Sequence, residues 1–263
     1  MELITQSGVR RGDDHQTFCE DFLVYHETDN FHYGAVLDGC SSAVESHFAS
    51  ALFGKILKSC FIKRSTLINS GVMLEFLGII GDFKKMLNDT AFNINLSKEE
   101  LKSTIIISIF DKSCSQLLVA NFGDGVIVVN GEKKILENTK YDNHNAPDYF
   151  VDDFFNKKSS EFIVYIFEEF KGYNIYKDVT DYTIASDGLL SFRSDSGFSP
   201  DDHKVIDFFA LNNWNIENET IISKKTNLLK NGKGQKNGNP FEECVTNADD
   251  VSVIRVIKKQ HEI

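Results

Sequence analysis

The stretch 103–131 reads "STIIISIFDKSCSQLLVANFGDGVIVVNG", and it decides the fold class. It holds three short apolar runs rich in β-branched residues, separated by Asp, Ser and Gly. Such residues favour strands, and short runs between turn residues are typical of a sheet meander. We therefore predict strands over 103–110, 115–123 and 125–131.

The segments around this meander alternate between helical and strand patterns. Apolar residues recur at helical spacing over 41–61, and Ser42 with Glu45 forms a capping-box pattern before them. Ser97 with Glu100 predicts a short capped helix over 97–103, and Ser199 before Pro200 predicts the start of another. The remaining predictions are helices over 71–92, 200–211 and 216–230, strands over 21–26, 32–37, 161–167, 181–186 and 251–258, and an irregular, flap-like insertion around 138–160.

This order of elements predicts an α+β fold. Helices and antiparallel strands are segregated along the chain, which suits two packed, mostly antiparallel β-sheets (a β-sandwich) flanked by antiparallel helix pairs. The chain has 263 residues, of which 41% are hydrophobic. That length and composition fit a single domain spanning 1–263.

Charge and cysteine content exclude several classes of protein. The formal net charge is −11, so nucleic-acid binding through a basic surface is not expected. The five cysteines include no CxxC pair, which argues against a disulfide framework or a thiolate zinc site and favours a cytoplasmic location. No secretory signal opens the chain, and the apolar runs are too short to span a membrane.

Carboxylates recur where apolar runs end or begin. Asp38, Asp124 and Asp187 each stand directly before a glycine at such a point, and Asp249 with Asp250 opens the last apolar run. One Asp-Gly pair alone is most simply a turn. Several at strand ends can converge on one edge of a sheet, where they need a counter-charge. Oxygen ligands suit Mg²⁺ or Mn²⁺.

The chain resembles the type 2C metal-dependent Ser/Thr protein phosphatases (PPM-type). The motifs that carry the resemblance lie in the family's order along nearly the whole chain. They are "CEDFLVY" (19–25), "VLDGCSSA" (36–43), "STIIISI" (103–109), "ANFGDGVIVV" (120–129), "IASDGLLSF" (184–192) and "DDVSVIRV" (249–256).

The resemblance implies a β-sandwich with a two-metal site at one end and assigns a role to each matching residue. Asp38 would bridge both Mn²⁺ or Mg²⁺ ions, and a third ion would bind more weakly. The other implied metal ligands are Glu20, the carbonyl of Gly39, Asp187, Asp249 and, for the third ion, Asp124. Asp21 would be a water-mediated partner, and Asp250 adds charge nearby or is itself the ligand if the register shifts by one.

The implied reaction is hydrolysis of phosphoserine and phosphothreonine in proteins. Two such ions can share a bridging water and lower its pKa, and the resulting hydroxide attacks phosphorus. The residues implied as catalytic are Glu20, Asp38, Asp187 and Asp249. The implied partners are a phosphoprotein substrate and a cognate Ser/Thr kinase system, with the phosphatase itself a monomer.

Two departures from the family pattern bear on the mechanism. Cys40 stands where many relatives carry a His proposed as general acid, so His15 or a metal-bound water is a candidate substitute. Gln16 stands where relatives often carry a phosphate-binding Arg, so Arg10 or Arg11 is a candidate anchor, the alternative being two solvated surface arginines.

Two other functions compete with an active protein phosphatase. These departures would also suit a catalytically weak pseudophosphatase that binds a phosphoprotein or another partner. A haloacid-dehalogenase-type phosphohydrolase for small molecules would need an Asp-x-Asp motif, and "VLDGC" (36–40) lacks the second Asp.

Overall fold

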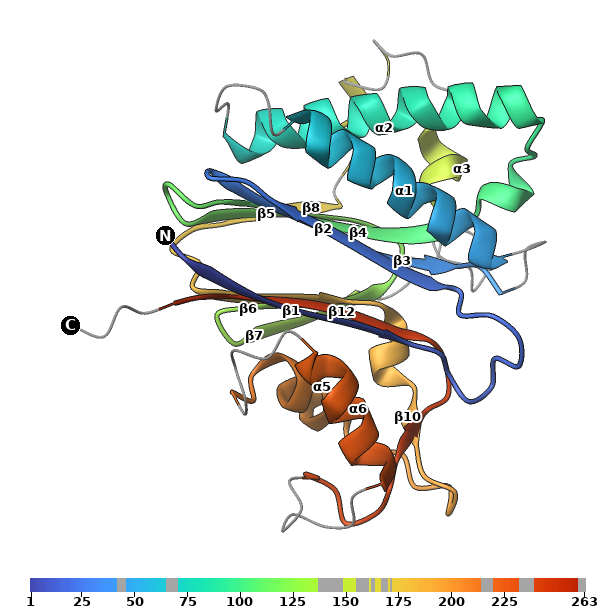
Figure 1. Cartoon of the computed structure of the whole chain (residues 1–263), viewed down its shortest axis with the longest axis vertical. Helices are drawn as coiled ribbons and strands as arrows, with labels where there is room; N and C mark the ends of the chain where they lie inside the picture. Colours follow the sequence, from blue (N-terminus) through green and yellow to red (C-terminus); the bar gives the residue numbers. More distant parts are fainter. Residues whose placement is uncertain are drawn as a thin grey trace.

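Two five-stranded sheets pack face to face, with helices on both outer faces (Figure 1). This is a computed structural model, and it describes residues 1–41, 46–64, 71–136, 149–154, 161, 164–166, 170, 172–213, 220–231 and 239–259. All strand pairs among these residues are antiparallel. The predicted α+β sandwich is confirmed.

The strands of the first sheet lie in the order β1-β12-β9-β6-β7, and those of the second in the order β2-β3-β4-β5-β8. A two-stranded ribbon of β10 (Phe192–Arg193) and β11 (Thr246–Asn247) stands apart. The first sheet comprises β1 (Leu3–Arg10), β6 (Gly125–Val129), β7 (Glu132–Leu136), β9 (Asp181–Ala185) and β12 (Val251–Lys258). The second comprises β2 (Asp21–Glu27), β3 (Phe31–Gly39), β4 (Ser103–Asp111), β5 (Gln116–Phe122) and β8 (Tyr173–Tyr176).

Helices cover both outer faces of the sandwich (Figure 1). On the second sheet lie α1 (Ser46–Arg64), α2 (Val72–Ile94) and α3 (Phe150–Phe154), and on the first lie α5 (Asp202–Ala210) and α6 (Ile221–Asn231). Short 3₁₀ turns are η1 (Glu99–Leu101) and η2 (Asp187–Leu190). Each helix layer buries an apolar cluster against its sheet, and a third cluster fills the space between the sheets. Within the described part of the chain, no helix is long and apolar enough to cross a membrane.

The strand register gathers the predicted acidic motifs at one end of the sandwich. In the second sheet β2 begins at Asp21, which pairs with Asp38 near the end of β3. β3 ends at Gly39 opposite Ser103, where β4 begins. In the first sheet β9 ends and β12 begins at the same end, since β12 and β9 pair antiparallel and Ser186 after β9 reaches Asp21 of the other sheet. The chain thus brings distant acidic motifs together through antiparallel pairing.

Several local predictions were wrong. Segment 161–167, predicted as a strand, is helical where it is described, at Glu161 and 164–166. β1, β7 and β8 were not predicted. The N-cap of α5 is Asp201, whose carboxylate accepts the Lys204 amide, rather than Ser199. The predicted cap formed by Ser42 and Glu45, and most of the 138–160 insertion, lie outside the described residues.

Other local predictions were confirmed. The predicted strands 21–26 and 32–37 form and pair as β2 and β3, and α2 and β12 lie close to their predicted ranges. Ser97 and Glu100 bond reciprocally, because the Ser97 amide donates to Glu100 Oε2 at 2.8 Å and the Glu100 amide donates to Ser97 Oγ at 3.4 Å. The cap initiates the short turn η1 rather than a longer helix.

Candidate active site

A buried serine joins the acidic ends of the two sheets. Ser186 follows β9 and donates its hydroxyl to Asp21 Oδ2 at 2.6 Å, while its own Oγ accepts the Ser252 amide of β12 at 3.0 Å. Asp21 is 4% exposed and pairs across the sheet with Asp38. The serine therefore locks the carboxylates of β2 and β3 to the end of β9 that carries Asp187.

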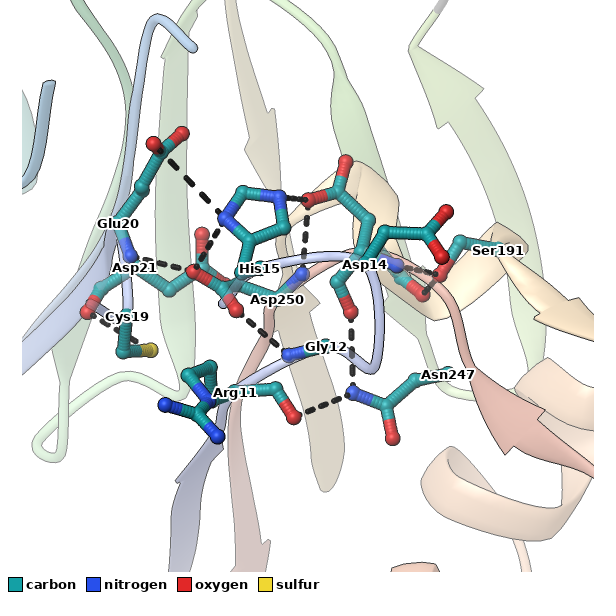
Figure 2. A network of polar contacts seen from close by, with 12 residues as sticks. Arg11, Gly12, Asp14, His15, Cys19, Glu20, Asp21, Ser191, Asn247 and Asp250 are labelled. Atoms are coloured by element: carbon teal, nitrogen blue, oxygen red, sulfur yellow. Dashed lines mark hydrogen bonds and ion pairs between the residues drawn. The ribbon is translucent and has the colours of Figure 1, made fainter. Parts of the chain in front are cut away.

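Asp250 organises the loop that runs from β1 to β2. Its side chain is fully buried, and its carboxylate accepts the Gly12 amide at 2.6 Å and the Glu20 amide (Figure 2). Two backbone amides and a partly buried imidazole surround this carboxylate, so it is compensated in place. The side chain predicted to add charge near Asp249 therefore anchors both ends of loop 12–20.

His15 projects from this loop into the carboxylates (Figure 2). Its Nε2 lies 2.9 Å from Asp249 Oδ1, and its Nδ1 lies 3.4 Å from Asp250 Oδ2 and 3.8 Å from Glu20 Oε1. A carboxylate on one ring nitrogen fixes the orientation of the ring and thereby aims the other nitrogen. The sequence suggested His15 as a candidate by elimination, and the fold puts it in contact with Asp249.

Loop 12–20 is held tightly against the start of β12. A Cβ on Gly12 would lie 2.3 Å from the Ala248 carbonyl oxygen, so the close approach requires glycine. The amides of Asp13 and Asp14 donate to the carbonyls of Asn247 and Ala248, both at 3.0 Å. The segment between Arg11 and Glu20 is thus a packed element, and it carries His15.

Asp187 stands where β9 turns into η2. The next residue, Gly188, lies against β12 so closely that a Cβ would be 1.7 Å from the Asp250 carbonyl oxygen. Glycine therefore lets the turn pass over the start of β12 and brings Asp187 beside Asp249. The amide of Asp249 is held by the Ser191 hydroxyl at 3.0 Å, which fixes the other side of this contact.

The acidic side chains raise one another's pKa values. Burial raises the pKa of Asp38 well above its ordinary value, and the charges of Asp21, Asp187 and Asp249 add to that rise. Burial raises the pKa of Asp187 to about 7, helped by the charges of Asp124 and Asp249. Burial also raises the pKa of Asp21 to about 8 and, more modestly, the pKa of Asp249. Within the described residues, burial and mutual repulsion therefore outweigh the contacts that would favour the charged form of these carboxyls.

The donor chemistry at this end suits hard divalent cations. Carboxylate oxygens predominate, and the raised pKa values indicate a deficit of positive charge that such ions would offset. Among the described residues, His, Cys, Asp and Glu side chains do not form a closed set of three or more arranged around one ion. The residue types fit Mg²⁺ or Mn²⁺, while their side chains are turned toward hydrogen-bond partners such as His15.

The two arginines suggested as phosphate anchors make their bonds elsewhere. Arg10 Nη1 donates to Asn227 Oδ1 of α6 at 2.6 Å. Arg11 Nη1 donates to the carbonyl of Gln16 at 3.2 Å, within loop 12–20. Arg11 thus braces the segment that carries His15, and neither bond points to the carboxylates.

Tyr149 was not predicted as part of the site. It is 6% exposed, and burial raises its pKa, with Cys40 and the charges of Asp38 and Asp124 adding to that rise. The residue follows a polar segment that gave no strand or helix pattern, so no sequence signal placed it. Ser186 lies within the motif "IASDGLLSF" (184–192) and was given no predicted role, although a hydroxyl just before an acidic turn can donate a bridging hydrogen bond.

The fold and the acidic end define the class of protein. The family model for protein phosphatase 2C matches residues 11–225. The chain therefore belongs to the protein phosphatase 2C family. Comparison with curated proteins gave no match.

Solved structures share the fold at low identity. The Ser/Thr phosphatase Stp1 from Staphylococcus aureus matches with a TM-score of 0.57 at 13% identity, covering 99% of this chain and 96% of that one. RsbX in complex with magnesium matches with a TM-score of 0.51 at 12% identity, covering 98% and 96%. The SpoIIE phosphatase domain with a regulatory fragment, from Bacillus subtilis, matches with a TM-score of 0.50 at 13% identity, covering 98% of this chain and 63% of that one.

Proposed function

We propose that this chain is an active, metal-dependent protein phosphatase that hydrolyses phosphoserine and phosphothreonine. The observation that carries the proposal is the gathering of Asp38, Asp187 and Asp249 at one end of the sandwich, where burial and the charges of the other two raise the pKa of Asp38. Strongly perturbed carboxylates cluster at functional sites, and a bound cation would relieve this repulsion.

In this proposal Asp38 would contribute to holding two ions. Glu20 and the Gly39 carbonyl would help to hold one of them, Asp187 and Asp249 the other, and Asp124 with Asp187 a weaker third. When bound, the ions would activate a water for attack on phosphorus and offset the phosphoryl charge. The magnesium in the RsbX structure supports Mg²⁺ as one candidate, with Mn²⁺ the other.

His15 is proposed as the proton donor to the departing serine or threonine oxygen. Its Nε2 lies at the partly exposed Asp249, where substrate would enter, and Asp250 holds its Nδ1. A buried carboxylate that orients a histidine is a recurrent arrangement for proton transfer. Here it would stand in for the histidine that Cys40 replaces.

The test is hydrolysis of p-nitrophenyl phosphate by wild type and Asp38→Ala, with Mn²⁺, Mg²⁺ or EDTA. We expect turnover that requires metal and disappears in the variant. A His15→Ala variant should lose more activity on a phosphoserine peptide than on p-nitrophenyl phosphate, since p-nitrophenolate departs without a proton. Equal losses on both substrates would refute the proposed proton donation.

A pseudophosphatase is the second candidate, favoured by one observation. His15 already occupies Asp249, and both arginines are engaged elsewhere. Folded wild type that binds Mn²⁺ in calorimetry but turns over neither substrate would establish this alternative. The phosphoprotein and its kinase would then be sought by binding rather than by turnover.

A further inference from the structure

The chain just before β4 lies against the turn that carries Asp38. β3 ends with Gly39 paired opposite Ser103, the first residue of β4. The two chains stay paired one step further, because the Cys40 amide donates to the Lys102 carbonyl at 3.2 Å. Lys102 has extended backbone angles, with φ −78° and ψ 113°. It therefore lies at the rim of the acidic end, just beyond the last strand pair.

The alternation of side chains along β4 places Lys102 on the same face of the sheet as Asp38. Ile105 packs in the cluster beneath α1 and α2, and Ile106 packs in the cluster between the sheets. Successive side chains of an extended chain point to opposite faces, so Lys102 shares the face of Ile106. Asp38 lies on that face too, because it pairs with Thr104. Cross-strand positions offset by two residues are about 7–8 Å apart, which the flexible stem of a lysine can span.

The ammonium of Lys102 is held by a partner that it can exchange. It forms an ion pair with Glu99, whose side chain is 64% exposed, whereas that of Lys102 is 24% exposed. The ammonium also lies 5.9 Å from the centroid of the Tyr149 ring. Burial raises the pKa of Tyr149, and Cys40 and the charge of Asp38 add to that rise, so this ring lies near the acidic end. An ion pair this exposed contributes little to stability, so a more highly charged anion can take the place of Glu99.

A phosphate ester that enters the acidic end needs a cation from the chain. Its phosphoryl group carries close to two negative charges at neutral pH. Arg10 and Arg11 bond elsewhere, to Asn227 and to the carbonyl of Gln16. Lys102 is charged at neutral pH, because its bond to Glu99 raises its pKa further. Lysine binds phosphate as a point charge, so its ammonium needs no bidentate geometry to do so.

We propose that Lys102 is a substrate-binding residue that exchanges Glu99 for the phosphoryl group of the substrate. This inference rests on the proposed function, because it assumes that a phosphate ester binds at the acidic end. Lys102 would supply the cation that was predicted at Arg10 or Arg11. The exchange replaces a single carboxylate by a dianion, so it is favoured when substrate arrives and is reversed when inorganic phosphate leaves.

The experiment measures how inorganic phosphate inhibits hydrolysis of p-nitrophenyl phosphate at pH 7 with saturating Mn²⁺. Wild type is compared with Lys102→Gln and Lys102→Arg. Without the ammonium, the inhibition constant for phosphate and KM should each rise about tenfold, because a charge-assisted hydrogen bond is lost. The change in kcat should stay below about threefold, since the bond is made to substrate and product alike. Lys102→Arg keeps the charge and should restore most of the affinity.

Lys98→Gln is the matched control. Lys98 lies on the same segment, and its Nζ is 2.7 Å from Asp152 Oδ1. The exchange removes the same charge as Lys102→Gln but from a side chain that is turned to another partner. We expect the inhibition constant and KM to stay at their wild-type values. An equal rise in both variants would trace the effect to net charge and would overturn the inference.

Glu99→Gln should change the affinity for phosphate in the opposite direction. Once the competing carboxylate is gone, Lys102 binds phosphate without giving up a partner, so the inhibition constant should fall about two- to fivefold. The gain should vanish when Glu99→Gln is combined with Lys102→Gln. A gain that persists without Lys102 would show that the two side chains do not act together and would contradict the proposed exchange.

The outcomes separate the two proposals. Wild type that neither turns over p-nitrophenyl phosphate nor binds phosphate in calorimetry defeats the proposed function and this inference with it. Active wild type with an unchanged Lys102→Gln variant defeats only the inference. A rise in KM confined to phosphopeptides with acidic flanking residues would mean that Lys102 binds the peptide instead, which also overturns it. If the protein proves to be a pseudophosphatase, weaker calorimetric binding of phosphate to Lys102→Gln than to wild type still supports the inference.

Discussion

β12 touches two clusters of buried charge, and they differ in kind. Near its end, Arg255 is 1% exposed and its guanidinium meets the Asp181 carboxylate at 3.2 and 2.5 Å and the Asn212 carbonyl at 2.9 Å. Just before its start, Asp249 lies among carboxylates that raise one another's pKa. The first cluster pairs its buried guanidinium with a carboxylate, whereas the second gathers several carboxylates around one histidine, His15.

This difference distinguishes the Arg255 cluster, which stabilises the fold, from the acidic cluster, which is proposed to bind metal ions. Lys225, fully buried beside Arg255, donates to the carbonyls of Phe209 and Asn212 at 3.1 and 3.0 Å, so the basic cluster ties the end of α5 to β12. It needs nothing from outside the chain. The acidic cluster gains stability only when positive charge arrives, and that dependence is what a metal site requires.

The largest expected effect comes from Asp38→Asn at the acidic cluster. We expect activity with Mn²⁺ to fall about 10³-fold or more, since the bridging carboxylate is lost. In EDTA at pH 8 the same variant should be more stable than wild type by about 1 kcal/mol, because burial raises the pKa of Asp38 and an amide avoids the cost of burying that carboxyl. Activity assays and urea unfolding measure the two effects.

Asp111→Asn is the matched control for this exchange. Asp111 is also buried, at the far end of β4, but its carboxylate accepts the Ser113 amide at 2.8 Å and the Ser113 hydroxyl at 2.6 Å. We expect the Asp111→Asn variant to keep the activity of wild type and to have a lower free energy of unfolding. If Asp38→Asn were destabilised in EDTA as much as Asp111→Asn, the acidic cluster would be compensated after all.

The second prediction concerns Arg255→Met at the basic cluster. Removing the guanidinium leaves Asp181 without its partner and should cost about 3–5 kcal/mol of unfolding free energy. Lys225→Met should cost much less, because burial and the charge of Arg255 already lower the pKa of Lys225 to about 7. Urea unfolding of both variants at pH 7.5 decides the matter, and a loss below about 1 kcal/mol for Arg255→Met would contradict the comparison.

The sequence predicted the layers of the fold because its patterns there are local. The β-branched runs of β4, β5 and β6 form strands that are buried almost throughout, so composition and period agreed. β8 has only four residues and pairs at the edge of its sheet, and β7 has three charged residues followed by two apolar ones, so neither pattern stood out. Their strand conformation depends on pairing with β5 and β6.

At the site, the acidic residues could be predicted but the bonds between them could not. The acidic residues could be named because each follows or precedes an apolar run and matches a motif. The bonds that organise them could not, because Asp250 to Gly12 and Ser186 to Asp21 each join residues more than 160 positions apart. No local pattern encodes such pairs.

The smallest predicted effect extends the comparison to a buried group that stays neutral. His32 is fully buried between the sheets, with Nδ1 2.9 Å from the Tyr182 hydroxyl and Nε2 3.1 Å from Thr5 Oγ1. Burial lowers the pKa of His32 to about 3, and the charges of Lys112 and His26 lower it further. Above pH 6.5 the imidazole is neutral in both the folded and the unfolded chain and contributes no pH dependence.

As the pH falls below 6.5, the unfolded chain binds a proton at His32 and the folded chain does not, so stability is lost progressively down to about pH 3. At pH 5 the loss is about 2 kcal/mol. His32→Asn should abolish this part of the loss, so the difference in unfolding free energy between variant and wild type should shift by about that amount between pH 7.5 and pH 5. His26→Asn, on the same hairpin but only partly buried, should show little shift. An unchanged difference for His32→Asn would mean that the folded protein accommodates the proton, so that this buried group, like the acidic cluster, can change its charge within the fold.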